Sequence, residues 1–214
     1  MNLKLSPVSR ERLPFLAGSL LLTAVVAMFK LHWLTGLFGI LTIFIFNFFR
    51  DPGRTVPVGA KLIVSPADGT IVGVSEVRED RFIKDRAVKI SIFLNIFNVH
   101  VNRIPCSGRI RGMYYQPGTF LAASKELAST ENEQNAVFLE TTEGAKLVFV
   151  QVAGLVARRI VCWIKEGEVV ERGARFGMIR FGSRTDLFLP IGTEIKVTPG
   201  DKVKGAETII GVLK

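Results

Sequence analysis

The sequence contains only two cysteines, Cys106 and Cys162, and only two histidines, His32 and His100, among its 214 residues. So few cysteines exclude a small scaffold held together by disulfides. A structural zinc site needs spaced pairs of cysteine or histidine ligands, which isolated residues do not provide, so no metal site is predicted. We interpret both cysteines as small buried residues of a protein in a reducing compartment.

Common catalytic motifs are also missing. There is no Gly-x-x-x-x-Gly-Lys-Ser/Thr phosphate loop, no Gly-x-Gly-x-x-Gly, no His-Glu-x-x-His and no Gly-x-Ser-x-Gly. Of the two histidines, only His100 lies outside a long apolar segment. Acid–base chemistry by an imidazole near neutral pH would therefore depend on His100.

Acidic residues are the minority among the charged residues. The chain has 28 Lys and Arg against 19 Asp and Glu, a formal net charge of +9. No basic block with interleaved aromatic residues occurs, which argues against a nucleic-acid partner. A mild positive excess beside an apolar segment fits the anionic headgroups of a membrane better.

The hydrophobic residues are concentrated near the start of the chain. Residues 14–49 are apolar almost throughout, interrupted by Lys30 and His32. A signal peptide has one short apolar core, so we predict a membrane anchor instead. Two apolar halves flank a polar and aromatic turn at residues 30–33, which favours a helical hairpin; one long tilted span is the alternative.

Positive residues lie on both outer flanks of this segment, which favours a hairpin with both ends in the cytoplasm and places the protein at the cytoplasmic face of the cell membrane. These residues are Lys4, Arg10, Arg12, Arg50 and Arg54. The chain is therefore expected to comprise a tail and anchor, residues 1–49, and a second domain, residues 50–214.

The second domain is predicted to be mainly β, because short runs rich in Val, Ile and Phe alternate with turn residues at spacings of about 8–12 positions. The expected strands are Leu62–Ser65, Thr70–Val77, Ala87–Leu94, Arg109–Tyr115, Asn135–Thr141, Lys146–Val152, Ile160–Ile164 and Met178–Phe181, then 187–190, 194–198 and 208–213. Only Phe120–Ala128 has a helical pattern. This order predicts an antiparallel barrel or sandwich.

Two turn sequences, Gly167–Gly173 and Gly200–Gly205, resemble each other, and each precedes an apolar strand. The pattern is similar to the hammerhead turns of lipoyl and biotinyl domains, so we expect a barrel-sandwich of that type. No Met-Lys-Met or Asp-Lys-Ala attachment sequence occurs at a hairpin tip, so a carrier role is not expected.

Three local sequences are each common in proteins but are informative in combination. They are Ser-Pro-Ala-Asp-Gly at 65–69, Asn-Val-His-Val-Asn-Arg at 98–103 and Phe-Gly-Ser-Arg at 181–184. Taken alone, the first is an ordinary turn, the second is a segment after the strand Ala87–Leu94 with a structural, hydrogen-bonding histidine, and the third is a Gly-Ser pair after the strand Met178–Phe181.

In combination these motifs resemble the phosphatidylserine decarboxylase family in its short form. Further matching sequences extend the resemblance over essentially the whole chain: Phe-Phe-Arg-Asp-Pro (48–52), Gln-Pro-Gly-Thr-Phe (116–120) and Asn-Glu-Gln-Asn (132–135). Longer members have a second histidine where this chain has Arg103, and their cleavage site reads Leu-Gly-Ser-Thr.

The resemblance implies a lyase made as a self-cleaving precursor. The Ser183 hydroxyl would attack the Gly182 carbonyl, and the resulting ester would eliminate to give a β chain, 1–182, and an α chain, 183–214. The latter would begin with a covalent pyruvoyl group made from Ser183. This pyruvate-derived cofactor would form a Schiff base with phosphatidylserine and release CO2 and phosphatidylethanolamine. His100 would act as acid and base, oriented by Asp68.

The residues that would contact the lipid substrate are less clearly indicated by the sequence than those that would carry out the chemistry. Arg103 and Arg184 are candidates for binding the lipid phosphodiester. Ile96, Phe97 and Phe120 are candidates for facing acyl chains, although core packing is the preferred interpretation for them.

Two alternatives remain at the level of sequence. The same chemistry could act on an ether-linked lipid of the archaeal type, since the reacting headgroup is the same. A membrane-tethered β-barrel that binds a partner without catalysis would instead keep the Gly182–Ser183 bond intact. Homo-oligomerisation is left open by the sequence.

Overall fold

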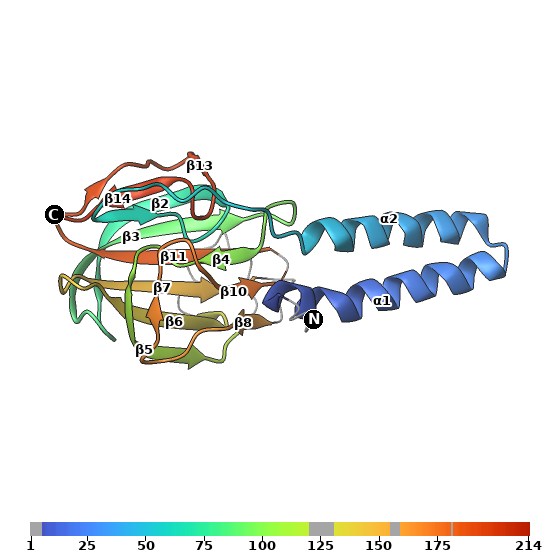
Figure 1. Ribbon diagram of the computed structural model, residues 1–214, viewed down its shortest axis with the longest axis horizontal. Helices are drawn as coiled ribbons and strands as arrows, with labels where there is room; N and C mark the ends of the chain where they lie inside the picture. Colours follow the sequence, from blue (N-terminus) through green and yellow to red (C-terminus); the bar gives the residue numbers. More distant parts are fainter. Residues whose placement is uncertain (1–5, 120–130, 155–158, 181) are drawn as a thin grey trace, which may run out of the picture. The chain divides into compact units, whose positions relative to one another are not determined.

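The computed structural model describes residues 6–119, 131–154, 159–180 and 182–214. The chain divides into two compact units, Met1–Pro52 and Gly53–Lys214. Figure 1 shows that the first is helical and the second is built of strands. The division falls after Pro52, slightly later than the boundary expected after residue 49.

The helical unit contains α1 (Pro7–Met28) and α2 (His32–Phe48). The first helix begins well before the apolar run, because Ser6 caps it: the Ser9 N–H donates to Ser6 Oγ at 3.2 Å. Pro7 takes the first helical position, where its missing N–H costs nothing.

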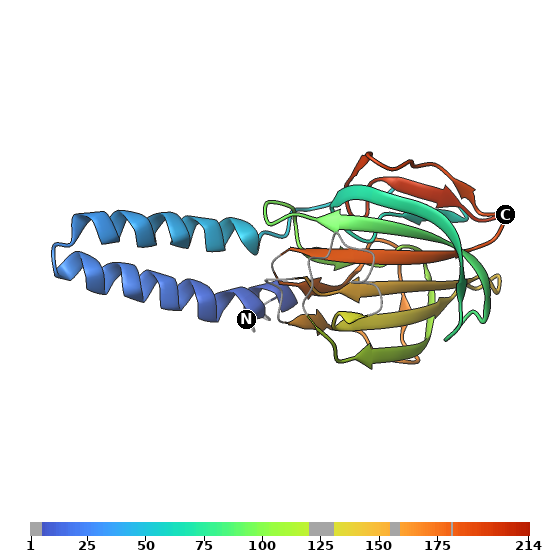
Figure 2. The ribbon, with the colours of Figure 1, turned by 180° about the vertical axis from the view of Figure 1, so that it is seen from behind.

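The two helices lie side by side and antiparallel, as the opposite views of Figures 1 and 2 both show. The hydroxyl oxygens of Thr23 and Thr42 are 3.3 Å apart across their interface. Many large apolar side chains point outward, including Trp33 with 94% of its surface exposed. Within the described residues, α1 is the one helix long and apolar enough to cross a membrane, and α2 is a shorter apolar helix.

All strand pairs in the described part of the β unit are antiparallel. Its strands in the described residues are β1 (Leu62–Val64), β2 (Gly69–Glu79), β3 (Asp85–Leu94), β4 (Val101–Arg103), β5 (Gly108–Gln116), β6 (Gln134–Glu140), β7 (Lys146–Val152), β8 (Ile160–Cys162), β9 (Val169–Val170), β10 (Arg175–Ile179), β11 (Ser183–Pro190), β12 (Glu194–Ile195), β13 (Lys202–Val203) and β14 (Ile209–Val212).

The described residues of this unit form three sheets. The largest has the strand order β13-β2-β3-β11-β7-β6-β5-β9, and the two small sheets have the orders β4-β10-β8 and β1-β14-β12. Figure 1 shows the large sheet curling around the small ones. The prediction of a mainly β, antiparallel barrel or sandwich is confirmed.

The apolar core lies between the sheets. The rings of Phe149 in β7 and Phe176 in β10 meet edge to face, with centroids 4.8 Å apart. This contact joins the large sheet to the sheet of β4, β10 and β8. Large buried aromatic pairs of this kind add to the free energy gained by burying apolar surface.

Most of the expected strands are present within one or two residues of their predicted ends, and Lys146–Val152 coincides with β7. Three strands, β4, β9 and β13, were not predicted, and Phe120–Ala128 lies outside the described residues. The expected strand end at Phe181 is corrected: β10 ends at Ile179. Ser183 is the first residue of the next strand, β11, which begins four residues earlier than the expected strand at 187–190.

The two similar turn sequences have similar backbones. Gly167 and Gly200 both take positive φ, at 84° and 100°. Each is followed after one residue by a strand of two residues, β9 or β13, and then by a longer strand, β10 or β14. Positive φ at the first position explains why glycine starts both turns.

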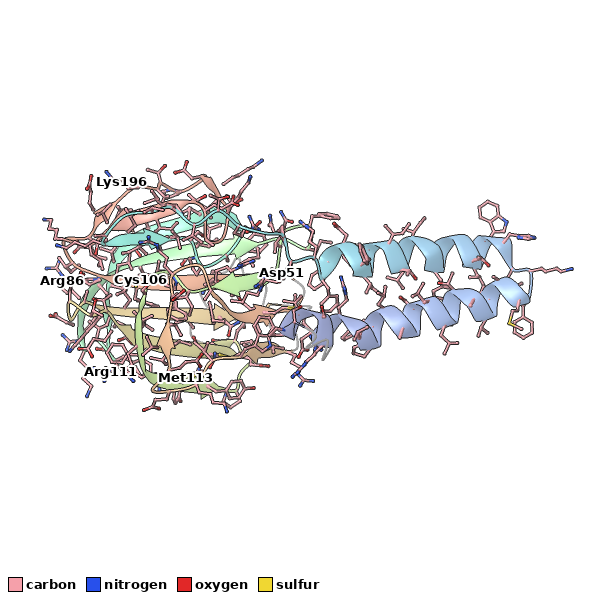
Figure 3. All side chains as sticks on the ribbon, viewed as in Figure 1. Asp51, Arg86, Cys106, Arg111, Met113 and Lys196 are labelled. Carbon is pink, nitrogen blue, oxygen red and sulfur yellow. The ribbon has the colours of Figure 1, made fainter. Side chains whose placement is uncertain are left out.

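Three surface cations of the β unit pair with nearby carboxylates. Arg86, Arg111 and Lys196 lie at its periphery in Figure 3, and they pair with Glu76, Glu140 and Glu194 respectively.

Candidate active site

The candidate nucleophile Ser183 is the first residue of β11, the strand that pairs with β3 on one side and β7 on the other. It is fully buried, and its Oγ has no hydrogen-bond partner among the described residues. A buried hydroxyl without a partner is costly in a folded protein and calls for a chemical explanation.

Gly182 precedes this serine with a backbone φ of +53°. No atom lies within 4 Å of the place a Cβ would occupy, so space is not what requires glycine here. The left-handed conformation is the reason, because residues with a Cβ adopt it only at a cost. The peptide bond between Gly182 and Ser183 therefore follows an unusual turn directly before the central strand.

His100 lies immediately before β4 and is fully buried. Its Nδ1 is 2.9 Å from the carbonyl oxygen of Asn98. Because a carbonyl oxygen only accepts hydrogen bonds, Nδ1 carries the proton in this contact. In the neutral ring, Nε2 is then the basic nitrogen.

The strands bring Ser183 and His100 to the same end of the β unit. The Ile179 N–H, at the end of β10, donates to the His100 carbonyl at 3.4 Å. Only three residues separate Ile179 from Ser183, and Ser183 pairs with Leu94 at the end of β3. The loop after Leu94 leads directly to His100, so short connections from both sides converge there.

Asp68 is anchored by other groups than the imidazole. Arg54 Nη2 donates to both carboxylate oxygens at 2.8 Å, and the Gly205 N–H donates to Oδ1 at 2.8 Å. The turn that carries Asp68 lies beside β4, because the Arg103 N–H donates to the Pro66 carbonyl at 2.8 Å. The structure thus places Asp68 near the strand after His100 without a hydrogen bond between them.

The two arginines proposed for substrate contact both have protein acceptors. Arg184 is almost fully buried and forms a two-point ion pair with Asp186, with N–O distances of 2.9 and 3.1 Å. It points to the opposite side of β11 from Ser183, because neighbouring residues of a strand alternate. Arg103 is also buried, and its Nη1 donates to the Gly173 carbonyl at 3.2 Å.

Neither thiol is suited to act as a nucleophile. Burial raises the pKa of Cys106 to about 12, and burial also raises the pKa of Cys162. Both cysteines are free, but they are protonated near neutral pH, and the thiolate is the reactive form.

Two residues that support the site went unrecognised at the level of sequence. Arg54 was interpreted as a membrane-flanking cation, yet its side chain is only 7% exposed and is paired with Asp68. Asn98 orients the imidazole through its backbone carbonyl. A backbone carbonyl has no residue-specific signal, and Arg54 lies just outside the motif at 48–52, so neither could be selected from the sequence.

Comparisons with known proteins identify the family. The family model described as phosphatidylserine decarboxylase matches residues 41–211. The phosphatidylserine decarboxylase proenzyme of Geotalea uraniireducens (strain Rf4) is 46% identical over 213 residues, and the alignment covers 100% of both chains. That of Geotalea daltonii is 48% identical over 208 residues, 96% of each chain. That of Syntrophus aciditrophicus is 47% identical over 206 residues, 95% of this chain and 96% of the relative.

Agreement over nearly the whole length makes this protein an enzyme of the decarboxylase class. The chain belongs to the phosphatidylserine decarboxylase family. The resemblance inferred from its motifs is confirmed.

Proposed function

We propose that this protein converts phosphatidylserine to phosphatidylethanolamine and CO2 at a membrane, using a pyruvoyl group that it makes from its own Ser183. The names of its relatives support the substrate and the precursor form. The observation that carries the proposal is the Gly182–Ser183 junction, where a left-handed glycine precedes a buried hydroxyl without a partner among the described residues.

Self-cleavage would begin with attack of Ser183 Oγ on the carbonyl carbon of Gly182. The peptide bond becomes an ester, and β-elimination then releases the Gly182 carboxylate. The dehydroalanine left at position 183 hydrolyses to the pyruvoyl group with loss of ammonia. A serine hydroxyl is a weak nucleophile unless a base removes its proton. The buried Oγ is suited to this step because no other hydrogen bond in the described chain has to be broken first.

His100 is the proposed base. Its Nδ1 donates to Asn98, so in the neutral ring Nε2 carries the lone pair that would accept the serine proton. In turnover the same nitrogen would deliver a proton to the substrate carbon that has lost CO2. The pyruvoyl ketone supplies the electron sink for that carbon, a task that many decarboxylases give to a separate cofactor.

The Asp68 carboxylate is hydrogen-bonded to Arg54 and Gly205. Asp68 is therefore proposed to act on His100 indirectly, by fixing the turn at 65–69 beside β4. For Arg103 and Arg184 to bind the lipid phosphodiester, each would have to exchange its present acceptor, the Gly173 carbonyl or Asp186.

The helical unit is proposed to anchor the enzyme in the cell membrane with the β unit on the cytoplasmic side. Its exposed apolar side chains and the length of α1 support this role. Ile96 and Phe97, which we expected to pack in the core, are 39% and 66% exposed. Because they lie in the loop that leads to His100, they are proposed to contact the acyl region of the substrate.

The α chain, residues 183–214, is proposed to stay bound after cleavage. It would begin with β11, which pairs with β3 along eight residues and with β7 along five. It would also contain β13 and β14, which pair with β2 and β1. These contacts hold both ends of the α chain to the β chain.

The test is the Ser183→Ala variant of the full-length chain, with Ser75→Ala, at an exposed position of β2, as the matched control. We expect wild type and Ser75→Ala to migrate as two bands on a denaturing gel, with a blocked N-terminus on the smaller one. Ser183→Ala should remain a single chain without CO2 release from phosphatidylserine vesicles.

Splitting of Ser183→Ala near residue 182 would contradict the pyruvoyl assignment. An intact wild-type chain would favour the non-catalytic barrel. A parallel assay with a serine headgroup on an ether lipid compares the two lipid backbones directly.

A further inference from the structure

Four polar side chains form a hydrogen-bonded chain through the interior of the β unit: Thr185, Asn102, Gln151 and Asn135. The first three are fully buried, and Asn135 is 6% exposed. Asn102 and Asn135 belong to the motifs at 98–103 and 132–135, but neither has a part in the chemistry proposed above. Buried polar groups of this kind are retained in a core only when their hydrogen bonds are made.

Gln151 is the centre of this polar chain. Its Nε2 donates to Asn102 Oδ1 at 2.9 Å and to the Val161 carbonyl at 3.4 Å, and its Oε1 accepts from Asn135 Nδ2 at 3.1 Å. Both amide hydrogens and the carbonyl oxygen are therefore used. Asn102 continues the chain by donating from Nδ2 to Thr185 Oγ1 at 3.5 Å.

These contacts join the two sheets that carry the site. Gln151, Asn135 and Thr185 lie in β7, β6 and β11 of the large sheet. Asn102 and Val161 lie in β4 and β8 of a small sheet. The polar chain is therefore a link across the core at a defined position along each strand.

The strand between β4 and β8 is shaped to admit this link. At Gly177 in β10, a Cβ would lie 2.7 Å from Gln151 Nε2 and 2.4 Å from the Val161 carbonyl oxygen. Any larger residue would displace the amide or the backbone, since real Cβ atoms do not approach so closely. Gly177 therefore leaves the space in which the Gln151 amide lies.

Two neighbouring members of the polar chain, Asn102 and Thr185, lie close in sequence to the reacting residues. Asn102 follows His100 by two residues, and Thr185 follows Ser183 by two residues. Residues two apart on a strand share a face and are separated by roughly 7 Å. The contact between Asn102 and Thr185 therefore sets the register of the two strand segments that carry His100 and Ser183.

We propose that Gln151, Asn102 and Thr185 are positioning residues for self-cleavage: they hold β4 and β11 in the register at which the His100 imidazole can reach the Ser183 hydroxyl. Amide hydrogen bonds are directional and costly to leave unmade, so a slip of one residue would break all of them at once. An apolar core would tolerate small slips better. The inference rests on the proposed function, because it concerns the same cleavage.

The experiment follows the first-order rate of cleavage of the full-length chain after synthesis, together with the thermal midpoint Tm of each variant. Thr185→Val removes the hydroxyl at nearly constant volume, and we expect cleavage about tenfold slower. Gln151→Leu removes the centre of the polar chain, and we expect a loss of at least ~10²-fold, the size that small misplacements of reacting groups produce. Thr185→Ser restores the hydroxyl and should cleave within about twofold of wild type.

The matched control is Leu187→Ala, a buried residue two positions further along the same face of β11. It should lower Tm through the cavity it creates while the folded protein cleaves at the wild-type rate. Wild-type rates in both Gln151→Leu and Thr185→Val would overturn the inference, as would rates that simply follow Tm in all variants, Leu187→Ala included. If Gln151→Leu does not fold, the pair Thr185→Val and Thr185→Ser decides. Absence of cleavage in wild type would instead overturn the proposed function itself.

Discussion

The buried imidazole of His100 takes its tautomer from a backbone carbonyl, that of Asn98, rather than from a carboxylate. A carbonyl cannot be protonated near neutral pH, so it fixes Nδ1 as the donor without adding a negative charge beside the ring. In a serine–histidine–aspartate triad a carboxylate performs the same orienting task.

We expect His100→Ala to slow self-cleavage by ~10²–10⁴-fold, the usual cost of losing one positioned acid–base group. The fraction that matures should also release CO2 slowly, because the same ring donates the later proton. His32→Ala, in α2, is the matched control and should cleave normally. Cleavage and CO2 release are measured separately, and cleavage of His100→Ala at the wild-type rate would remove His100 from the maturation step.

Asp68 and Arg54 form a pair with side chains only 14% and 7% exposed. Removing the cation leaves a mostly buried carboxylate held by the Gly205 N–H alone. The loss of one partner from a buried ion pair typically costs about 3–5 kcal/mol, much more than the loss of an exposed pair.

We therefore expect Arg54→Ala to lower the free energy of unfolding by about 3 kcal/mol and to slow cleavage, because the turn beside β4 loosens. Arg54→Lys should restore only part of the stability, since Arg54 contacts Asp68 through Nη2 and lies 3.8 Å from Glu207 through Nη1, and one ammonium group cannot make both contacts. Asp68→Asn should slow cleavage as well. Denaturant unfolding of the Ser183→Ala background measures stability without the complication of cleavage. The control Arg78→Ala breaks an exposed pair with Asp80 and should cost less than about 1 kcal/mol.

At the scale of elements, the loop Asn95–Asn98 combines a rigid backbone with exposed apolar side chains. The Asn95 N–H donates to Asn98 Oδ1 at 2.9 Å, and the Phe97 N–H donates to Asn95 Oδ1 at 2.8 Å. Asn side chains that bond to the local backbone in this way stabilise a turn without any pairing to a strand. The loop can therefore present Ile96 and Phe97 outward while its end holds the imidazole.

We expect Phe97→Ser to reduce CO2 release from phosphatidylserine in bilayers by roughly tenfold, because about 1.5 kcal/mol of apolar contact with lipid is lost. The loss should be smaller with a short-chain, water-soluble substrate. Val58→Ser, at a position that is 98% exposed, is the control and should leave both assays unchanged. Equal losses in both assays would assign Phe97 to packing instead.

The strands show what the sequence could and could not predict. β3 and β7 are apolar and β-branched, so their type and ends were predicted closely. The first half of β11, Ser183–Asp186, is polar yet buried, and its stability comes from pairing with β3 and β7 and from the Arg184–Asp186 ion pair. Periodicity of apolar residues carries no information about such a segment, so it was taken for a turn.

The same limit applies to the site. Ser183, Gly182 and His100 could be selected because their residue types fit the chemistry and the family motifs. The partner of Asp68 could not, because Arg54 looks like any other cation near an anchor, and its burial depends on tertiary packing. Long-range hydrogen bonds such as that of Gln151 to Asn102 are likewise set by the fold.

At the scale of the whole molecule, the chain is made of two units that differ in composition and in secondary structure. The β unit carries all the residues proposed for chemistry and has its own buried core. The helical unit carries most of the exposed large apolar side chains.

We expect a chain that lacks residues 1–52 to fold and to cleave itself, because Arg54, Asp68, His100 and Ser183 all remain. Its binding to vesicles should fall strongly, and CO2 release from bilayer substrate should fall with it. Circular dichroism, gel analysis and vesicle sedimentation measure the three properties. Failure of the truncated chain to fold would make the helices a structural part of the β unit; the full-length chain is the control.

The central place of β11 has a consequence for the lifetime of the enzyme. The strand pairs with β3 and β7 when the protein folds, while it is still part of one continuous chain. After cleavage the same strand belongs to a separate small polypeptide, and refolding would require two molecules to meet and one to insert into the middle of a sheet. The mature enzyme would then be assembled once only. Its persistence would depend on how slowly it unfolds, so heating should inactivate it irreversibly where the uncleaved Ser183→Ala chain recovers on cooling.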